Sequence, residues 1–347
     1  MSRSCMKIFY DSTLPNINLF KTHFELTAFD HQNLSILNKE MQSQDILICR
    51  STLKVSAELL QGTSIQCVAT ASSGIDHIDV HYLSQQGIQL FDAKGSNAES
   101  VDDYINATLA WLSKHNKIQG NKAGVVGVGK VGTRISASLK NWGFSVLSYD
   151  PPKASRVPDF DSCSLEEIIP CDLISIHADL NDLPNYPSRN LINQHVLTQL
   201  KPNTILINAA RGGIVNETAL CQQKNIIYCT DVYDHEPSIN AQTVNFSTLC
   251  TPHIAGHSLE AKSQAVVDLA KIIHRYFNLP EPNPLPALPH HVITSQFPGE
   301  CFEDYILRLY DPSIETAALK AASDKKNAFL TLRQAHQFRH HFSTLMD

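Results

Sequence analysis

The sequence lacks the patterns that mark several common kinds of binding site. Its nine cysteines are scattered, and no two of them form a C-x-x-C pair. We therefore expect neither a disulfide framework nor a structural zinc site. The sixteen histidines include no H-E-x-x-H motif, so we expect no metal site. No apolar span reaches about 18 residues, which predicts a cytoplasmic protein without membrane contact.

A positive net charge is also missing. The formal net charge is -6 at pH 7, so the protein has no general attraction to nucleic acid or to acidic membranes. We expect neither as a partner. Any phosphate in a ligand must then be held by a few well-placed groups.

Short apolar runs alternate with polar, helix-like stretches along most of the chain. Its 347 residues exceed one ordinary core and predict two domains. Apolar runs in such alternation are typical of parallel strands covered by helices on both faces. The predicted fold class is α/β, with two Rossmann-like doubly wound sheets. The runs lie at 7–10, 46–49, 67–70 and 88–91, and then at 123–126, 145–149, 173–176, 204–207, 226–230 and 247–250.

Two helices and a proline-rich segment set the expected domain boundaries. One helix should begin at Ser96, which has capping-box spacing to Glu99, and another should run from about Ser258 to Phe277. Six prolines between 279 and 298 indicate a linker before an amphipathic, helical tail. The predicted domains are residues 1–96 with 256–280, then 97–255, and a small C-terminal α/β region at 281–347.

A G-x-G-x-x-G motif lies between the run at 123–126 and an amphipathic helix. Its glycines permit a tight turn and a close approach to a diphosphate, and the helix N-terminus offers unpaired N–H groups. Asp150 ends the next strand, where a carboxylate would bind the adenine ribose and repel the 2′-phosphate of NADP. The alternative is a glycine turn beside a solvated aspartate. We favour an NAD site that includes Gly127, Gly129, Lys130, Val131, Gly132 and Asp150.

Arg211, Glu236 and His253 each follow one of the later strand runs. Because the carboxyl ends of parallel strands meet at one edge of a sheet, we expect these side chains to lie close together. Arginine can clamp a carboxylate, and histidine can take a hydroxyl proton as hydride leaves. A carboxylate can orient that histidine and favour its charged form. The set predicts oxidation of a 2-hydroxy acid, the alternative being that His253 is a core histidine.

The motifs around these residues resemble the D-isomer-specific 2-hydroxyacid dehydrogenase superfamily. They are the glycine loop at 127–132 and the segments 208–213, 231–237 and 251–256. Within it, the segments 49–55, 73–79, 95–98, 150–152 and 253–260 resemble the erythronate-4-phosphate dehydrogenase family. The resemblance implies NAD-dependent oxidation of 4-phospho-D-erythronate to 2-oxo-3-hydroxy-4-phosphobutanoate, in pyridoxal 5′-phosphate (vitamin B6) biosynthesis. It also implies that the region 281–347 makes a homodimer.

The same resemblance implies a role for each site residue. Arg211 would bind the substrate carboxylate, and Glu236 would pair with His253, the proton donor or acceptor. NAD would also contact Ala178, Asp231 and Gly256, and the substrate would contact Ser51, Thr70 and His257. His257 stands where the family usually has tyrosine, and Ala178 where threonine is usual. The domain formed by residues 1–96 with 256–280 would bind substrate, and the domain 97–255 would bind NAD.

Other interpretations stay open at this point. One is a related dehydrogenase acting on glycerate, 3-phosphoglycerate or hydroxypyruvate, and another is a non-catalytic NAD(H)-sensing protein. Arg50 and Lys54 could hold the 4-phosphate or form an ordinary solvated pair. We interpret His77 and His177 as structural, and the pair at 102–103 as the solvated face of the connecting helix.

Overall fold

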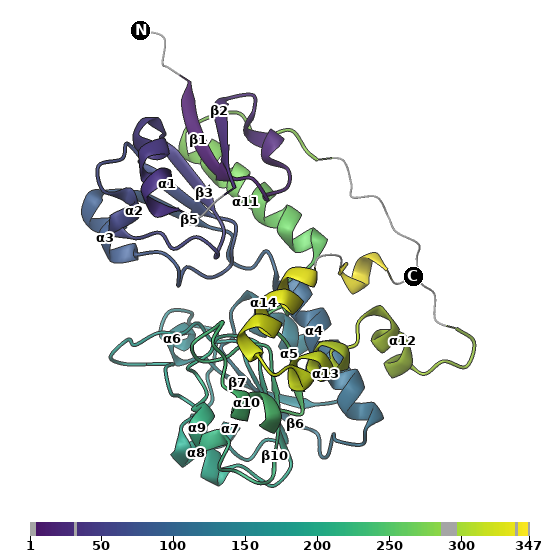
Figure 1. Ribbon diagram of the computed structural model, residues 1–347. Coiled ribbons are helices and arrows are strands. Elements are labelled where there is room, and N and C mark those ends of the chain that lie inside the picture. The colour runs from purple at the N-terminus through teal and green to yellow at the C-terminus, as the bar shows by residue number, and fades with distance from the viewer. Residues whose placement is uncertain (1–4, 31–32, 286–296, 337–338, 346–347) are drawn as a thin grey trace. The chain divides into compact units, whose positions relative to one another are not determined.

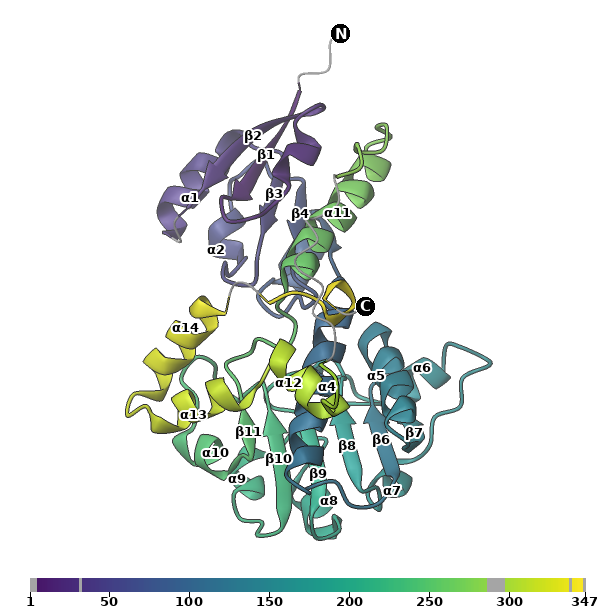
Figure 2. The ribbon, with the colours of Figure 1, turned by 90° about the vertical axis from the view of Figure 1, so that its right-hand side faces the viewer.

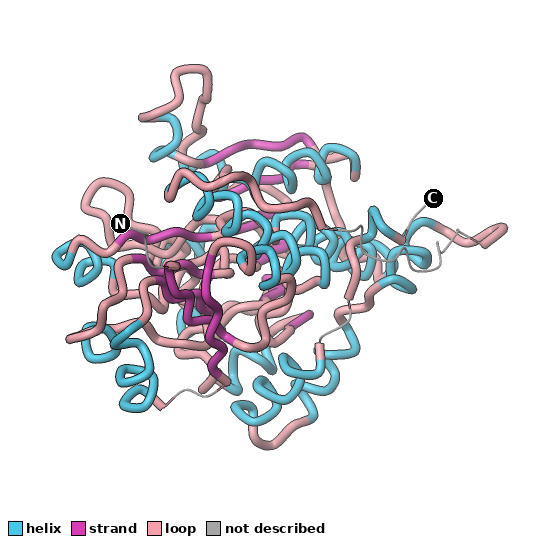
Figure 3. Tube along the Cα trace, turned by 90° about the horizontal axis from the view of Figure 1, so that it is seen from above, coloured by secondary structure: helices cyan, strands magenta, loops and turns pink. Residues whose placement is uncertain are grey.

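The computed structural model describes residues 5–30, 33–285, 297–336 and 339–345. The chain divides into two compact units, Met1–Asn97 with Leu259–His290 and Ala98–Ser258 with His291–Asp347, and Figure 1 labels their elements. Each unit holds one sheet whose strand pairs are all parallel. Helices (cyan in Figure 3) accompany the strands (magenta) throughout. The predicted α/β, doubly wound fold class is confirmed.

The first unit contains a five-stranded sheet in the order β2-β1-β3-β4-β5. Four of these strands coincide closely with the predicted runs, but β2 was missed. Its sequence, Phe-Glu-Leu-Thr-Ala-Phe, has no continuous apolar run because it is an edge strand with only partial burial. The strands are β1 (Met6–Asp11), β2 (Phe24–Phe29), β3 (Ile46–Cys49), β4 (Cys67–Thr70) and β5 (Gln89–Asp92).

Alternate residues of these strands pack on opposite faces of the sheet. On β3, Ile46 and Ile48 belong to the core formed with α11 (Leu259–Tyr276). Leu47 and Cys49 belong to the opposite core, formed with the helices α1, α2 and α3. Both faces are therefore covered, which explains why β3 is apolar along its whole length. The remaining helices are η1 (Ile17–Phe20), α1 (Leu34–Glu40), η2 (Met41–Ser43), α2 (Ala57–Leu60) and α3 (Val80–Gln86).

The second unit contains a six-stranded sheet in the order β11-β10-β9-β8-β6-β7, labelled in Figure 2. The strand order reverses at β6, which pairs with β7 on one side and β8 on the other. In open α/β sheets, ligands bind beyond the carboxyl ends of the strands at such a reversal. The strands are β6 (Lys122–Val126), β7 (Ser145–Tyr149), β8 (Leu173–Ile176), β9 (Thr204–Asn208), β10 (Ile226–Thr230) and β11 (Leu249–Cys250).

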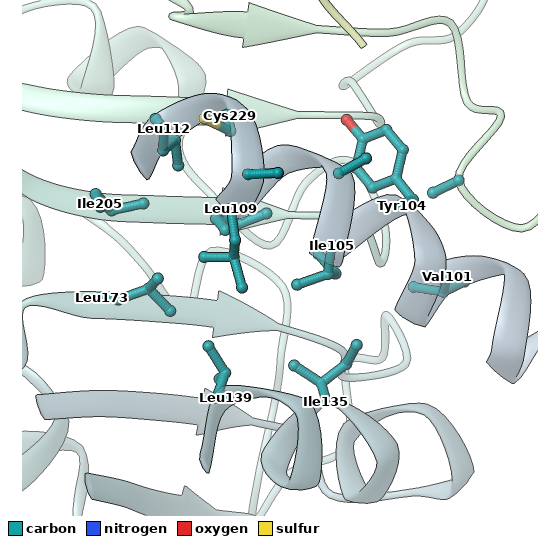
Figure 4. Packing of buried hydrophobic residues seen from close by; sticks show 14 of the residues in the cluster. Val101, Tyr104, Ile105, Leu109, Leu112, Ile135, Leu139, Leu173, Ile205 and Cys229 are labelled. Carbon is teal, nitrogen blue, oxygen red and sulfur yellow. The ribbon is translucent and has the colours of Figure 1, made fainter. Parts of the chain in front are cut away.

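The helices α4 (Ala98–Lys114) and α5 (Lys130–Asn141) cover one face of this sheet. Figure 4 shows Ile105 and Leu109 of α4 and Leu139 of α5 directed at strand residues such as Leu173. The predicted apolar stripe of α4 is thus the buried face, although the helix begins at Ala98 rather than Ser96. The other helices are α6 (Pro151–Ala154), α7 (Leu165–Ile168), α8 (Gln194–Gln199), α9 (Glu217–Leu220) and α10 (Ala241–Phe246).

The C-terminal tail packs on the second unit. Ile306 and Tyr310 join the core formed by α4 and α5, and Leu319 and Phe329 join a separate core with Tyr233. Among its described residues the tail has helices and no strand, so the α/β character expected there is absent from them. None of the described helices is both long and apolar enough to cross a membrane. The tail elements are α12 (Phe302–Leu309), α13 (Ser313–Ala321), α14 (Lys325–Ala335) and η3 (Phe342–Thr344).

Asp103 shows how closely the tail covers α4. Its side chain is buried, with 6% of the residue exposed, and its Oδ2 accepts the backbone N–H of Phe342 at 3.1 Å. Burial raises the pKa of the Asp103 carboxyl to about 7, although the Phe342 N–H and the charge of Arg339 oppose this. The interpretation of residues 102 and 103 as a solvated face is therefore wrong for Asp103. The tail residues that bury it have no local sequence relation to α4.

This burial predicts a pH-dependent contribution to stability. Because the folded protein binds the Asp103 proton more tightly than the unfolded chain, the contribution is complete below about pH 4 and is lost as the pH rises through about 7. Asp103→Asn stays neutral and should lose less stability than the parent between about pH 4 and about pH 7. Thermal unfolding at several pH values measures this, with exposed Asp159→Asn as the control. Parallel pH curves for the parent and Asp103→Asn would contradict it.

Candidate active site

The glycine loop connects β6 to α5, and each of its glycines has a different local role. Gly127 has φ +84°, and a Cβ there would overlap the backbone of Ala178, the second residue after β8. A Cβ on Gly132 would overlap the carbonyl oxygen of Gly127. Gly129 occupies the N-cap position of α5, where no side chain caps the helix and a Cβ would meet nothing within 4 Å. The loop is thus tightly packed on the protein side and open at Gly129, which fits a diphosphate.

Asp150 connects the end of β7 to this loop. Its Oδ2 accepts the N–H of Val128 at 2.8 Å, and its Oδ1 accepts the N–H of Lys153 at 2.9 Å. Lys153 in turn donates from Nζ to the carbonyl of Val128 at 2.8 Å. The predicted cofactor residues Lys130 and Val131 form the first turn of α5 beside it. The structure therefore places the glycine loop, Asp150 and Ala178 around one end of the sheet.

A hollow of about 640 Å³ opens beside Asp150, lined in part by Tyr149, Pro151 and Tyr186. The residues before and after Asp150 both contribute to it. Sequence reasoning did not find Tyr186 because no motif spacing relates it to the glycine loop. Its lining combines the aromatic rings of Tyr149 and Tyr186 with polar side chains such as Ser162 and Glu166.

Arg211, Glu236 and His253 follow β9, β10 and β11, which are neighbours in the sheet. Asn208 forms the turn before Arg211, because its side chain accepts the N–H of Ala210 and donates to the carbonyl of Arg211 at 3.0 Å. Arg211 itself is half-buried, with Nη1 donating to the carbonyl of Ala210 at 2.7 Å. The three segments leave the same edge of the sheet from adjacent strands, and the closeness of the three side chains stays a prediction.

The residue after Arg211, Gly212, has no room for a side chain. A Cβ at this position would overlap the carbonyl oxygen of Tyr233. The segment after β9 therefore runs directly against the segment 231–237 after β10, which carries Glu236. Close backbone contact between these two segments fixes the position of Arg211 relative to that of Glu236.

His253 and Glu236 form a hydrogen-bonded pair, with Nδ1 of His253 2.6 Å from Oε2 of Glu236. The other oxygen of Glu236, Oε1, accepts the N–H of Tyr233 at 2.9 Å. Burial acts to raise the pKa of the Glu236 carboxyl, but the charge and hydrogen bond of His253 outweigh it and, with the Tyr233 N–H and Arg333, hold that pKa below its ordinary value. Glu236 is therefore ionised at neutral pH and accepts a proton-bearing Nδ1.

The backbone of His253 has φ +57°, in the left-handed region that a histidine rarely adopts. Asp231 stabilises this conformation through hydrogen bonds to the loop that follows His253. Its Oδ1 accepts the N–H of Ile254 at 2.7 Å, and its Oδ2 accepts the N–H of Ala255 at 2.8 Å. Asp231 is 1% exposed, and burial raises its pKa even though His253 and these bonds act to lower it. The residue predicted to contact NAD thus also holds the loop that carries His253 and Gly256.

Ser51 and Thr70, the predicted substrate contacts, lie at neighbouring strand ends of the first unit. Ser51 follows β3, is exposed, and donates its backbone N–H to Oγ of Ser72 at 3.0 Å. Thr70 ends β4, and its Oγ1 lies 3.1 Å from Nε2 of His77. His77 therefore orients Thr70. His257, the third predicted contact, is half-buried in the loop that precedes α11.

A cationic group lies where the strand order of the first unit reverses, between β1 and β3. Arg50 follows β3, and its Nε donates to Oδ2 of Asp11, at the end of β1, at 3.0 Å. Burial, together with the charge of Arg50, lowers the pKa of Lys262 on α11. Lys54 is exposed on the loop after β3. Two cations, Arg50 and Lys262, are thus near each other at this strand edge.

The remaining histidine of interest, His177, is half-buried after β8. Its Nε2 lies 2.8 Å from Oγ of Ser175, and burial lowers its pKa to about 3, so it is neutral. Within the described ranges, no group of three or more histidine, cysteine or carboxylate side chains could hold a metal ion.

Arg333 of α14 lies 3.9 Å from Oε2 of Glu236. No motif in the sequence indicated this contact, because α14 lies in the tail.

The chain matches known proteins over nearly its whole length. Residues 98–255 match the family described as D-isomer specific 2-hydroxyacid dehydrogenase, NAD binding domain. An erythronate-4-phosphate dehydrogenase from Legionella pneumophila is 45% identical over 345 residues, covering 99% of this chain and 97% of the relative. The protein of that name from Coxiella burnetii is 33% identical over 347 residues, covering 98% of this chain and 94% of the relative.

Solved structures show the same fold at lower identity. An NAD⁺-bound 3-phosphoglycerate dehydrogenase from Entamoeba histolytica aligns with a TM-score of 0.67 and 21% identity, over 79% of this chain and 96% of its own. A D-lactate dehydrogenase from Aquifex aeolicus aligns with a TM-score of 0.61 and 20% identity, over 78% and 95%. The chain therefore belongs to the D-isomer specific 2-hydroxyacid dehydrogenases, in the erythronate-4-phosphate dehydrogenase family, and it is an NAD-dependent dehydrogenase.

Proposed function

We propose that the protein oxidises 4-phospho-D-erythronate at C2 to 2-oxo-3-hydroxy-4-phosphobutanoate, on the route to pyridoxal 5′-phosphate. The relatives that match almost the whole chain carry the name of this activity. The observation that carries the chemistry is the 2.6 Å contact between His253 and an ionised Glu236, one strand away from Arg211. This arrangement supplies a base, a group that orients it, and a cation for the substrate carboxylate.

In the proposed reaction, Arg211 clamps the carboxylate of the substrate through its planar guanidinium. His253 is held through Nδ1 by Glu236, which leaves Nε2 to take the proton of the C2 hydroxyl. NAD, when bound, accepts the hydride that leaves C2. The C2–H and O–H bonds break, a carbonyl forms, and the proton is held on His253 beside the carboxylate of Glu236. That carboxylate stabilises the imidazolium.

The cofactor site proposed is the carboxyl end of the second unit's sheet. Residues 97–255 would be the NAD-binding domain, and residues 1–96 with 256–280 the substrate-binding domain. The open N-terminus of α5 supports diphosphate binding, and the Asp150 carboxylate supports NAD over NADP because it would repel a 2′-phosphate. The residues proposed to contact NAD are Gly127, Gly129, Lys130, Val131, Gly132, Asp150, Ala178, Asp231 and Gly256.

For the phosphate of the substrate we propose Arg50 and Lys262. Arg50 pairs with Asp11, yet its charge still helps to lower the pKa of Lys262, so an anion bound by both cations would be stabilised. Ser51 follows β3 and Thr70 ends β4, which are neighbouring strands. Together with His257, they are the proposed contacts to the rest of the substrate. Lys54 is the alternative cation.

We also propose a cytoplasmic homodimer. The tail buries one set of apolar side chains in its own unit but leaves others exposed. Ile314 of α13 is 68% exposed and Leu330 of α14 is 47% exposed. Exposed large apolar side chains on adjoining helices support association with a second copy through the tail, at 281–347.

The catalytic pair predicts distinct effects for two substitutions. His253→Ala should lower kcat by about 10²–10⁴ because it removes the base. Glu236→Gln should move the rising limb of the kcat–pH profile to lower pH, because the imidazolium loses its charged partner and gives up its proton more readily. Initial rates of NADH formation measure both. Thermal unfolding and NAD binding serve as controls, and a folded His253→Ala protein with the parent kcat would exclude the catalytic role.

The phosphate site predicts a change in substrate preference. Arg50→Gln and Lys262→Gln should each raise KM for 4-phosphoerythronate by roughly tenfold or more, because each removes a charged partner of the phosphate. KM for unphosphorylated erythronate should change little. Lys54→Gln is the comparison variant: if it raises KM and Lys262→Gln does not, the phosphate lies at Lys54 instead.

The dimer can be tested without removing the tail, whose helices are part of the core. The full chain should sediment as a dimer at micromolar concentration, and Ile314→Arg should shift it toward monomer because a charge replaces an apolar contact. Ile36→Arg, on an exposed apolar residue of the first unit, should leave association intact. A parent protein that sediments as a monomer would refute the proposal.

A further inference from the structure

The tail helix α14 packs against the segment that carries Glu236. The rings of Phe329 on α14 and Tyr233 lie 6.0 Å apart in an edge-to-face arrangement. Tyr233 is fixed at both ends, because its N–H donates to Oε1 of Glu236 and its hydroxyl donates to the carbonyl of Thr251 at 3.1 Å. The aromatic contact therefore joins α14 to the two segments that carry Glu236 and His253.

Arg333 lies one helical turn beyond Phe329, on the same side of α14. Its Nη1 is 3.9 Å from Oε2 of Glu236, the oxygen that accepts Nδ1–H of His253. Its guanidinium also lies 6.0 Å from the centroid of the Phe329 ring. The side chain is 27% exposed and thus mostly withdrawn from water. One carboxylate oxygen is therefore shared between the histidine and a cation from the tail.

Several contacts fix α14 in this place. On α13, Thr316 accepts the N–H of Cys250 at 2.9 Å and donates to its carbonyl at 3.0 Å, at the end of the edge strand β11. His336, which caps α14, lies 3.0 Å from Oε1 of Glu315 on α13. Lys325 donates to carbonyl oxygens at the end of α13. Thus α13 attaches to the strand that leads to His253, and α14 attaches to α13.

We propose that Arg333 is a positioning residue for the Glu236–His253 pair, so that the C-terminal tail completes the active centre from the same chain. The inference rests on the proposed function, because it assumes that the pair is catalytic. Arg333 would hold the Glu236 carboxylate in the orientation that receives His253, and it would limit how strongly that carboxylate favours the imidazolium.

The charges around the pair show why a cation is needed. Asp231 lies close to His253, and Glu217 on α9 lies close to both Glu236 and Asp234. When ionised, these acids place negative charge around the pair. Arg333 contributes the opposite sign, and its charge acts with that of His253 to lower the pKa of Glu236.

The test is the pH profile of kcat for Arg333→Gln and Arg333→Met in the full chain. Without the cation the imidazolium is favoured, so the rising limb should move to higher pH by about half a unit to one unit. Arg333→Lys should restore most of the parent profile. Arg308→Gln is the matched control, since it removes another tail arginine, one that pairs with Glu300 rather than with Glu236. The Arg308→Gln variant should keep the rising limb of the kcat–pH profile at the pH of the parent protein.

The outcomes separate this inference from the proposed function. In the Glu236→Gln background, Arg333→Gln should move the limb much less, because Arg333 acts through the carboxylate. A limb that stays in place in folded Arg333→Gln and Arg333→Met proteins, with only a lower melting temperature, would overturn the positioning role. That result would leave the proposed function intact if His253→Ala is inactive. Parent-level activity in His253→Ala would instead overturn the proposed function, whatever Arg333 does.

Discussion

The buried carboxylate of Asp231 is the interaction on which the geometry of the active centre depends. A carboxyl group with almost no exposure is costly to bury unless its oxygens are satisfied, and both oxygens of Asp231 accept hydrogen bonds from the loop after β11. These bonds hold His253 in a left-handed backbone conformation. That conformation brings its Nδ1 to Glu236.

The tail extends this network rather than forming a separate body. Arg339 donates to the carbonyl oxygens of Ala255 and His257, on the loop that Asp231 holds from the other side. Arg333 contacts Glu236, and Phe342 reaches Asp103 on α4. The loop that carries His253 is thus held by a buried acid and by Arg339 of the tail, while Arg333 contacts Glu236 on the neighbouring segment. Stability of the tail and precision of the active centre are therefore coupled through the same residues.

Much of the fold follows from local sequence, because a strand buried on both faces needs a continuous apolar run. All ten predicted strands occur, while the edge strand β2 escaped prediction because half of its residues remain polar or exposed. Arg211, Glu236 and His253 could be found because the carboxyl ends of parallel strands are brought together by the topology itself. Burial of Asp103 and the contact of Arg333 could not be found, since both depend on where the tail packs. The position of Lys262 beside Arg50 likewise depends on α11 returning to the first unit.

The network around His253 has one chemical purpose in this proposal, which is to transfer hydride from C2 of a 4-phosphorylated 2-hydroxy acid. The most direct measurement is the rate of NADH formation by the full chain with 4-phospho-D-erythronate, erythronate, glycerate and 3-phosphoglycerate. We expect the highest kcat/KM with 4-phospho-D-erythronate and a marked loss when its phosphate is absent. A higher kcat/KM with glycerate or 3-phosphoglycerate, or no turnover of any of the four, would contradict the proposal.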